Sequence, residues 1–146
     1  MHWLQDYPFN KTQQTNISLF LKRYGISGLM SAMQSYSDLH QEYICKTRTS
    51  ISRFKICDIY YLKILEHTIN VHTEYGTYQK YGSLSTELKY LAPCGFLKCN
   101  QSCVVSIRKI RTICSDDIIL TNGESLHLSR NYAPQIILAL SRKHQN

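Results

Sequence analysis

Residues 55–91 read KICDIYYLKILEHTINVHTEYGTYQKYGSLSTELKYL, and their pattern gives the clearest indication of secondary structure in the chain. Branched and aromatic residues dominate positions 58–65, which favours a β-strand there. Apolar and polar residues alternate over 68–73, as they do in a strand with one buried face. A turn containing Gly76 then leads into a third extended segment over 78–81. The stretch therefore predicts a strand followed by a β-hairpin.

The same stretch ends in a short helix. Ser83 can cap a helix over 85–91 with its hydroxyl group. Leu84, Leu88 and Leu91 fall on one face at helical spacing. An internal helix is therefore expected directly after the hairpin.

The pattern of short strands continues toward the C-terminus. Asn122–Gly123 predicts a type I′ hairpin turn, because both residues tolerate positive φ. A last helix is expected over 134–140. Five more strands are expected, over residues 96–99, 104–107, 109–114, 118–121 and 125–129.

The N-terminal part has a different pattern. The first fifteen residues suggest an irregular arm, and helical spacing predicts helices over 16–24 and 28–42, capped at Thr15 or Asn16 and separated by a glycine turn. Such a pair can be a DNA-reading helix-turn-helix or a helical hairpin that packs on another domain or subunit. We favour the packing role, since the second helix offers few side chains for phosphates or bases. Residues 43–52 and 53–56 are expected to be extended.

The charge is unevenly distributed along the chain. The net charge is +7. Residues 1–47 hold four Lys or Arg against three Asp or Glu, whereas 48–146 hold thirteen against seven. An excess of this kind in one segment is typical of a polyanionic partner, with basic solubility as the alternative.

Composition also limits the compartment and the cofactors. No secretory signal begins the chain and no apolar run approaches the roughly 20 residues of a membrane span, so we expect a cytoplasmic protein. Its six cysteines are then expected to be mostly buried thiols. Their spacing lacks the two close pairs of a zinc site, so neither a metal nor another cofactor is predicted.

No enzyme motif is recognisable. Residues 24–28 lack the Lys-Ser/Thr that completes a phosphate-binding loop. Asp116 and Asp117 are neighbouring carboxylates, but they fall at a predicted turn, where Asp is favoured for backbone reasons. We therefore predict no catalytic residue and no small-molecule substrate.

Four blocks of the sequence follow one another in the order of a known family: KICDIYYLKILEH (55–67), TINVHTEYGTYQKYGSLSTELKYL (68–91), GFLKCNQSCVVSIRKIRTI (95–113) and IILTNGESLHLSRNYAPQI (118–136). On these blocks, residues 48–146 resemble the LytTR DNA-binding domain of bacterial response regulators. The resemblance implies a mainly β fold, an elongated β-sheet sandwich of about ten short strands with a short internal helix, here preceded by the helical pair. It also divides the chain into 1–47, an arm and two-helix extension, and 48–146, the DNA-binding domain.

The resemblance implies that loops, not a recognition helix, enter the major groove of duplex DNA. Base or phosphate contacts are implied at His67, Gln101 and Arg130. Glutamine can pair bidentately with adenine, and arginine can pair bidentately with guanine. The alternative for Arg130 is a surface ion pair, for example with Glu124. Further DNA contacts, mainly to phosphates, are implied at Lys98, Asn100, Ser102, Arg108 and Lys109.

Three positions depart from the family pattern. Lys98 replaces the usual Arg, Asn100 the usual His, and Ser106 the usual Asn. Lysine keeps the charge but lacks the planar fork of arginine, so the departures affect the expected base sequence more than the fold.

The resemblance also bears on regulation. Residues 1–47 are too few for a receiver domain, which suggests a stand-alone LytTR transcription regulator acting at promoter repeats. Its expected partners are double-stranded promoter DNA, a second copy bound on DNA or through the N-terminal helices, and a membrane-bound inhibitor protein. The alternatives are a LytTR-fold interaction protein or anti-regulator that binds mainly a protein partner, and a two-site DNA binder that also uses 16–42.

Overall fold

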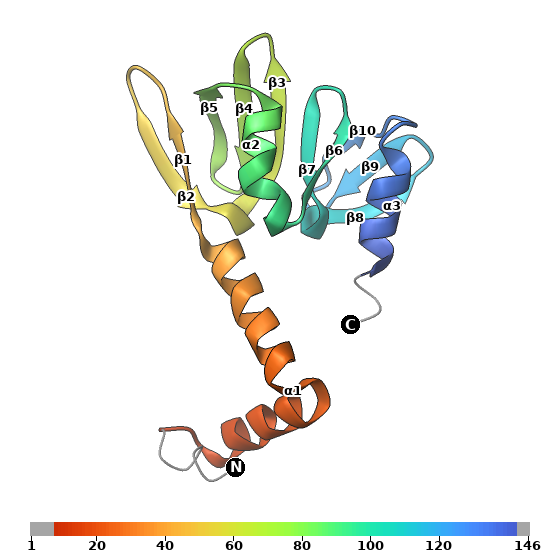
Figure 1. Ribbon diagram of the computed structural model, residues 1–146. Coiled ribbons are helices and arrows are strands. Elements are labelled where there is room, and N and C mark those ends of the chain that lie inside the picture. Colours follow the sequence, from red (N-terminus) through yellow and green to blue (C-terminus); the bar gives the residue numbers. More distant parts are fainter. Residues whose placement is uncertain (1–7, 143–146) are drawn as a thin grey trace. The chain divides into compact units, whose positions relative to one another are not determined.

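The computed structural model describes residues 8–142 (Figure 1). The chain divides into two compact units between Asp38 and Leu39. The first unit is helical and the second contains all the strands of the described chain. Residues 42–46, which the sequence division at 47 leaves with the helices, form a strand within the second unit.

In place of the two expected helices, the structure has one long helix that is kinked at Gly25 and has different bounds. Helix α1 (Lys11–His40) begins at a capping box in which the Gln13 amide donates to Asn10 Oδ1 at 2.8 Å and the Asn10 amide donates to Gln13 Oε1 at 3.0 Å. The helix thus begins five residues before the expected residue 16 and ends at His40, two residues before the expected residue 42, so both expected bounds were wrong. The helix changes direction at Gly25, whose φ of 75° and ψ of −176° are non-helical. Because a single residue interrupts α1, it lacks the three- to four-residue turn of a helix-turn-helix.

The second unit has ten strands in three antiparallel sheets. The first sheet is a hairpin of β1 (Glu42–Lys46) and β2 (Ile51–Lys55). The second has the order β5-β4-β3-β7-β6, from β3 (Ile59–Leu65), β4 (Thr68–Thr73), β5 (Gly76–Tyr81), β6 (Phe96–Asn100) and β7 (Cys103–Ser106). The third has the order β10-β9-β8, from β8 (Ile110–Cys114), β9 (Asp117–Leu120) and β10 (Ser125–His127).

Short helices connect these strands. Helix α2 (Leu84–Leu91) is the predicted internal helix, and its cap is the predicted one, since the Thr86 amide donates to Ser83 Oγ at 3.2 Å. Helix α3 (Ala133–Arg142) ends the described chain. Three 3-10 turns complete the unit: η2 (Ile56–Asp58), η3 (Ala92–Cys94) and η4 (Ile107–Lys109).

The strand number and the internal helix are thus confirmed, but the predicted class needs correction. The α-helices of residues 8–142 hold almost as many residues as the strands, so the chain is mixed α/β, not mainly β. Three separate sheets replace the expected β-sheet sandwich.

The five-stranded sheet is covered on both faces (Figure 1). On one face, Leu62 and Val71 pack with Leu91 of α2 and Phe54 of the β1–β2 hairpin. On the other, residues of β7 pack with the third sheet and with Ile136 of α3. Each fully buried aliphatic side chain contributes about 1.5–3 kcal/mol to the stability of the folded state. Because both core clusters include side chains of the five-stranded sheet, this sheet holds the second unit together.

The Asn122–Gly123 turn differs from its predicted type. Gly123 has a φ of 90°, but Asn122 does not have a positive φ, so the turn is not type I′. Leu120 and Glu124 close a three-residue loop, in which the Leu120 amide donates to the Glu124 carbonyl at 2.9 Å. A type I turn followed by a left-handed glycine gives this loop length.

The described residues carry few other functional signals. Within residues 8–142, no helix is long and apolar enough to cross a membrane, and no group of three or more His, Cys, Asp or Glu could hold a metal ion. As expected, most of the cysteines are buried, namely Cys45, Cys94, Cys99 and Cys103.

Candidate nucleic-acid interface

Two turns lie side by side at one end of the five-stranded sheet. The β3–β4 turn contains His67, and the β6–β7 turn contains Gln101. The two turns are neighbours because β3 pairs with β7. Lys63 of β3 pairs with Cys103 of β7, and the Ile64 amide donates to the Ser102 carbonyl at 2.9 Å. Figure 1 shows both hairpins ending at this end of the strands, which we call the edge. The sheet therefore brings His67 and Gln101 together from positions 34 residues apart in the sequence.

Asn100 shapes the second turn. Its Oδ1 accepts hydrogen bonds from the Ser102 amide at 3.0 Å and the Ser102 hydroxyl at 3.1 Å, which is the local pattern of an Asx turn. Its Nδ2 donates to the His127 carbonyl at 2.8 Å. Both ends of the Asn100 amide and the Ser102 hydroxyl are therefore used inside the protein, which suits positioning rather than direct contact with a ligand.

Hydrogen bonds to the end of β6 bring a third segment, residues 127–130, to this edge. The Ser129 amide donates to the Cys99 carbonyl at 2.9 Å, next to the Asn100–His127 hydrogen bond. Arg130 directly follows this anchor. The three residues implied as the main DNA contacts thus come from neighbouring segments of one edge.

These three side chains share an unusual property. His67, Gln101 and Arg130 are exposed, and none makes a side-chain hydrogen bond or ion pair within residues 8–142. The ion pair between Arg130 and Glu124 is not formed, since Glu124 instead accepts from Tyr61 at 2.7 Å and from Asn122 at 2.8 Å. Three exposed polar groups without internal partners, on segments joined by backbone hydrogen bonds, are suited to binding an external polar ligand.

A pocket of about 420 Å³ lies between the β6–β7 turn and β10. Gln101 lines it, together with two residues that sequence reasoning missed, Lys63 and His127. Both are exposed, and Lys63 adds a positive charge beside the turn. Only the β3–β7 register identifies Lys63, because a lysine within a strand carries no local sign of a binding site.

Lys98 lies on β6 and is half-buried. Its ammonium group is 6.0 Å from the centre of the Tyr132 ring, at the limit of a cation–π interaction. Such a contact orients the ammonium group without neutralising its charge. Lys98 thus lies near Tyr132, two residues after Arg130, where it can contact a phosphate.

Arg108 and Lys109 are not at this edge. They lie in η4, which follows β7 at the opposite end of the sheet, where Tyr61 pairs with Val105. Lys109 Nζ is 3.7 Å from Glu74 Oε1 and 4.7 Å from the centre of the Tyr60 ring. The structure therefore separates these two residues from the group formed by His67, Gln101 and Arg130.

Tyr61 of β3 connects the five-stranded sheet to the loop between β9 and β10, because its hydroxyl donates to Glu124 Oε2 at 2.7 Å. The Tyr61 ring stacks on His72 with centroids 4.2 Å apart, and burial together with the hydrogen bond to Glu124 raises the pKa of Tyr61. The phenol thus stays protonated and donates to Glu124. Burial lowers the pKa of His72 below its ordinary value, so His72 adds no positive charge at neutral pH.

Comparisons with known proteins agree with this architecture. Residues 49–141 match the family model described as the LytTr DNA-binding domain. A solved structure, described as the LytTr DNA-binding domain of a methyl-accepting/DNA response regulator from Bacillus cereus, is similar with a TM-score of 0.60 and 26% identity. The match covers 68% of this chain and 95% of that one. The search of curated proteins found no match.

Proposed function

Because the chain belongs to the LytTR DNA-binding domain family, we propose that it is a transcription regulator that binds duplex DNA sequence-specifically through the edge formed by the β3–β4 turn, the β6–β7 turn and residues 127–130. The family is not known to be catalytic, and the proposal includes no reaction. The observation that carries it is the presence of three exposed, unpartnered polar side chains, His67, Gln101 and Arg130, on adjoining segments of the described chain.

The chemistry of these side chains matches the edges of bases. Gln101 can pair with N6 and N7 of adenine, and Arg130 with O6 and N7 of guanine. His67 can donate to a phosphate or to a guanine. Lys63 and Lys98 supply phosphate contacts that set the register without reading sequence.

Other residues of the edge act indirectly. Asn100 and Ser102 hold the β6–β7 turn in shape, so they are positioning residues. Arg108 and Lys109 are outside the proposed interface, because they lie at the far end of the sheet, where Lys109 forms an ion pair with Glu74. Recognition runs through turns, since α2 packs its leucines against the sheet instead of presenting them to a groove.

Selection of bound duplexes from a random library, followed by fluorescence anisotropy, tests this function. We expect an enriched sequence that the full chain binds at least about 1,000-fold more tightly than its scrambled version. The logarithm of the affinity should fall linearly with the logarithm of salt concentration, because phosphate contacts release counterions. Equal affinity for the two duplexes, or none, would contradict a sequence-specific regulator and favour a protein that acts on a protein partner.

The first unit supports a second proposal, self-association. Residues 24–37 contain no charged side chain. Ile26, Met30 and Met33 recur at helical spacing, and each is more than 60% exposed. An uncharged apolar stripe of this kind can pack against the same stripe of a second copy without burying a charge.

Sedimentation velocity of the full chain tests the self-association. We expect wild type to sediment as a dimer at micromolar concentration and Met30→Lys/Met33→Lys to sediment as a monomer, because two lysines would be buried in the contact. The matched control is Ser31→Lys/Ser35→Lys, which adds the same charge on the opposite side of α1 and should remain dimeric. A monomeric wild type would contradict the dimer and leave the stripe to another partner, such as the inhibitor protein.

A further inference from the structure

The tip of the β1–β2 hairpin carries basic residues that the proposed interface does not use. Lys46 ends β1, and Arg48 lies in the turn that leads to β2. Both are exposed, and neither makes an ion pair or side-chain hydrogen bond in the described chain. Arg53 on the same hairpin differs, since its Nε is 3.5 Å from Glu42 Oε1. The tip thus presents two free cations.

The tip is an ordered turn. The Thr47 amide donates to the Ser50 carbonyl at 2.9 Å, and the two hydroxyl oxygens are 2.8 Å apart. A pocket of about 630 Å³ lies between this turn and the end of β5, lined by Lys46, Thr47, Arg48 and Tyr81. Tyr81 is 62% exposed and brings a phenol beside the two cations. Two cations and a hydroxyl donor around one hollow suit an anionic oxygen ligand.

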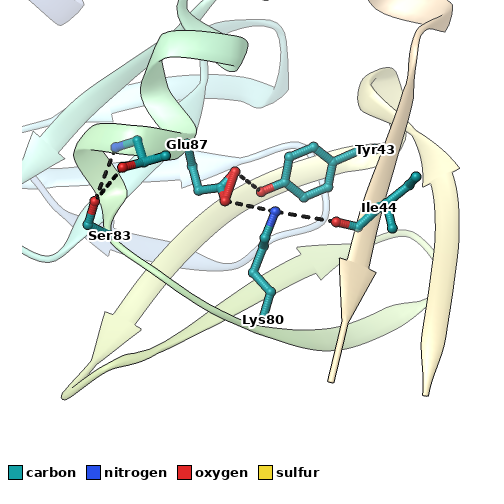
Figure 2. Close-up of polar contacts among 6 residues, drawn as sticks. Tyr43, Ile44, Lys80, Ser83 and Glu87 are labelled. Carbon is teal, nitrogen blue, oxygen red and sulfur yellow. Dashed lines mark hydrogen bonds and ion pairs between the residues drawn. The ribbon is translucent and has the colours of Figure 1, made fainter. Parts of the chain in front are cut away.

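Buried contacts hold the hairpin against the sheet (Figure 2). Lys80 Nζ is 2.7 Å from Glu87 Oε1, and the Tyr43 hydroxyl donates to Glu87 Oε2 at 2.9 Å. Lys80 also donates to the Ile44 carbonyl at 3.3 Å and lies 4.6 Å from the centre of the Tyr43 ring. These bonds tie β1 to β5 and α2, so the tip has a defined place in the second unit.

That place is next to the proposed interface. Tyr81 pairs with Thr68 directly after the β3–β4 turn, and the Gly82 amide donates to the His67 carbonyl at 3.4 Å. The tips of the β1–β2, β3–β4 and β6–β7 hairpins end toward the same side of the unit in Figure 1. Five strands at about 4.8 Å spacing span roughly 19 Å. Because β1 contacts β5, at the end of the order β5-β4-β3-β7-β6, the tip of the β1–β2 hairpin extends the row of hairpin tips beyond His67.

We propose that Lys46, Arg48 and Tyr81 bind the phosphate backbone of duplex DNA that flanks the sequence read by the turns on the His67 side. This inference rests on the proposed function. Arginine and lysine neutralise phosphates, and the Tyr81 hydroxyl donates to a phosphate oxygen. Contacts to phosphates carry no sequence information, so this site adds affinity and fixes the register without distinguishing base pairs.

Salt-dependent anisotropy with Lys46→Gln/Arg48→Gln tests the site on the selected duplex and on its scrambled version. Each lost phosphate contact should reduce the slope of log affinity against log salt by about 0.9, so we expect a slope smaller by about 1–2 on both duplexes. The ratio of the two affinities should stay unchanged. The matched control is Arg53→Gln/Lys55→Gln, which removes two charges from the base of the same hairpin and should leave the slope as in wild type.

A second measurement locates the contact on the DNA. Shortening the selected duplex by about half a helical turn at the end nearest the hairpin should weaken wild type and leave the tip variant unchanged. Shortening it at the other end should weaken both proteins equally.

The outcomes separate the two proposals. If wild type binds the selected duplex and Arg130→Ala weakens it, but the tip variant keeps the wild-type slope, the hairpin site is wrong and the proposed function stands. The same holds if the tip variant binds DNA normally but loses binding to polyglutamate, which would assign the tip to an acidic protein surface. If wild type binds no duplex, both proposals fail.

Discussion

Arg130→Ala should weaken binding to the selected duplex by about 1–3 kcal/mol and leave binding to a scrambled duplex nearly unchanged. The guanidinium of Arg130 is exposed and has no partner within residues 8–142, so its removal disrupts no internal contact. The loss should therefore appear in recognition and not in folding. Anisotropy titrations on both duplexes, with the melting temperature as a check on folding, measure the difference.

Gln101→Ala should have a similar effect at a different base pair. Its side chain is also exposed and unpartnered in the described chain, and the β6–β7 turn is held by Asn100 rather than by Gln101. Repeating the library selection with each variant should relax the preference at one position of the site and keep the others.

Arg108→Ala is the matched control for Arg130→Ala. It removes an exposed guanidinium from η4, at the opposite end of the sheet. We expect wild-type affinity for both duplexes. If Arg108→Ala weakens specific binding as much as Arg130→Ala does, the edge has been assigned to the wrong end of the sheet.

The parts of this fold that depend on neighbouring residues could be predicted from the sequence. The alternation in 68–73 and the cap at Ser83 are local, and β4 and α2 formed where these patterns indicated. The family resemblance of 48–146 is likewise confirmed by the match over 49–141. The early start of α1 was also predictable, since Asn10 and Gln13 have the spacing of a capping box, but the polar composition of the arm hid it.

The arrangement of the candidate site depended on pairings distant in the sequence. Lys98 and Lys109 are both basic residues near a strand end, and nothing local distinguishes the end of the sheet that each occupies. The β3–β7 register decides this, because it sets Gln101 beside the β3–β4 turn and η4 at the other end. Lys46 and Arg48 likewise carry no local sign of a binding site: the contact of β1 with β5 brings them beside Tyr81, which pairs with Thr68 directly after the β3–β4 turn.

The largest effect on stability is expected from Glu87→Ala. The Glu87 side chain is 8% exposed and accepts hydrogen bonds from both Tyr43 and Lys80 (Figure 2). Burial, reinforced by Glu87, raises the pKa of Tyr43, so the phenol stays protonated and needs an acceptor. Truncating Glu87 leaves this phenol without its acceptor and the largely buried Lys80 charge without its counter-charge, while the Lys80 hydrogen bond to the Ile44 carbonyl remains. The expected cost is about 3–5 kcal/mol. Urea denaturation of the full chain measures the loss.

Two further variants show whether the cost comes from the unpaired groups. Glu42→Ala breaks the exposed Arg53 ion pair at 3.5 Å and should cost at most about 1 kcal/mol. Lys80→Met/Glu87→Leu removes both charges together, and apolar replacement of a complete buried pair is often neutral, so it should recover most of the stability lost in Glu87→Ala. If the double variant is as unstable as Glu87→Ala, the carboxylate stabilises the hairpin through Tyr43 alone, and the ion pair with Lys80 contributes little.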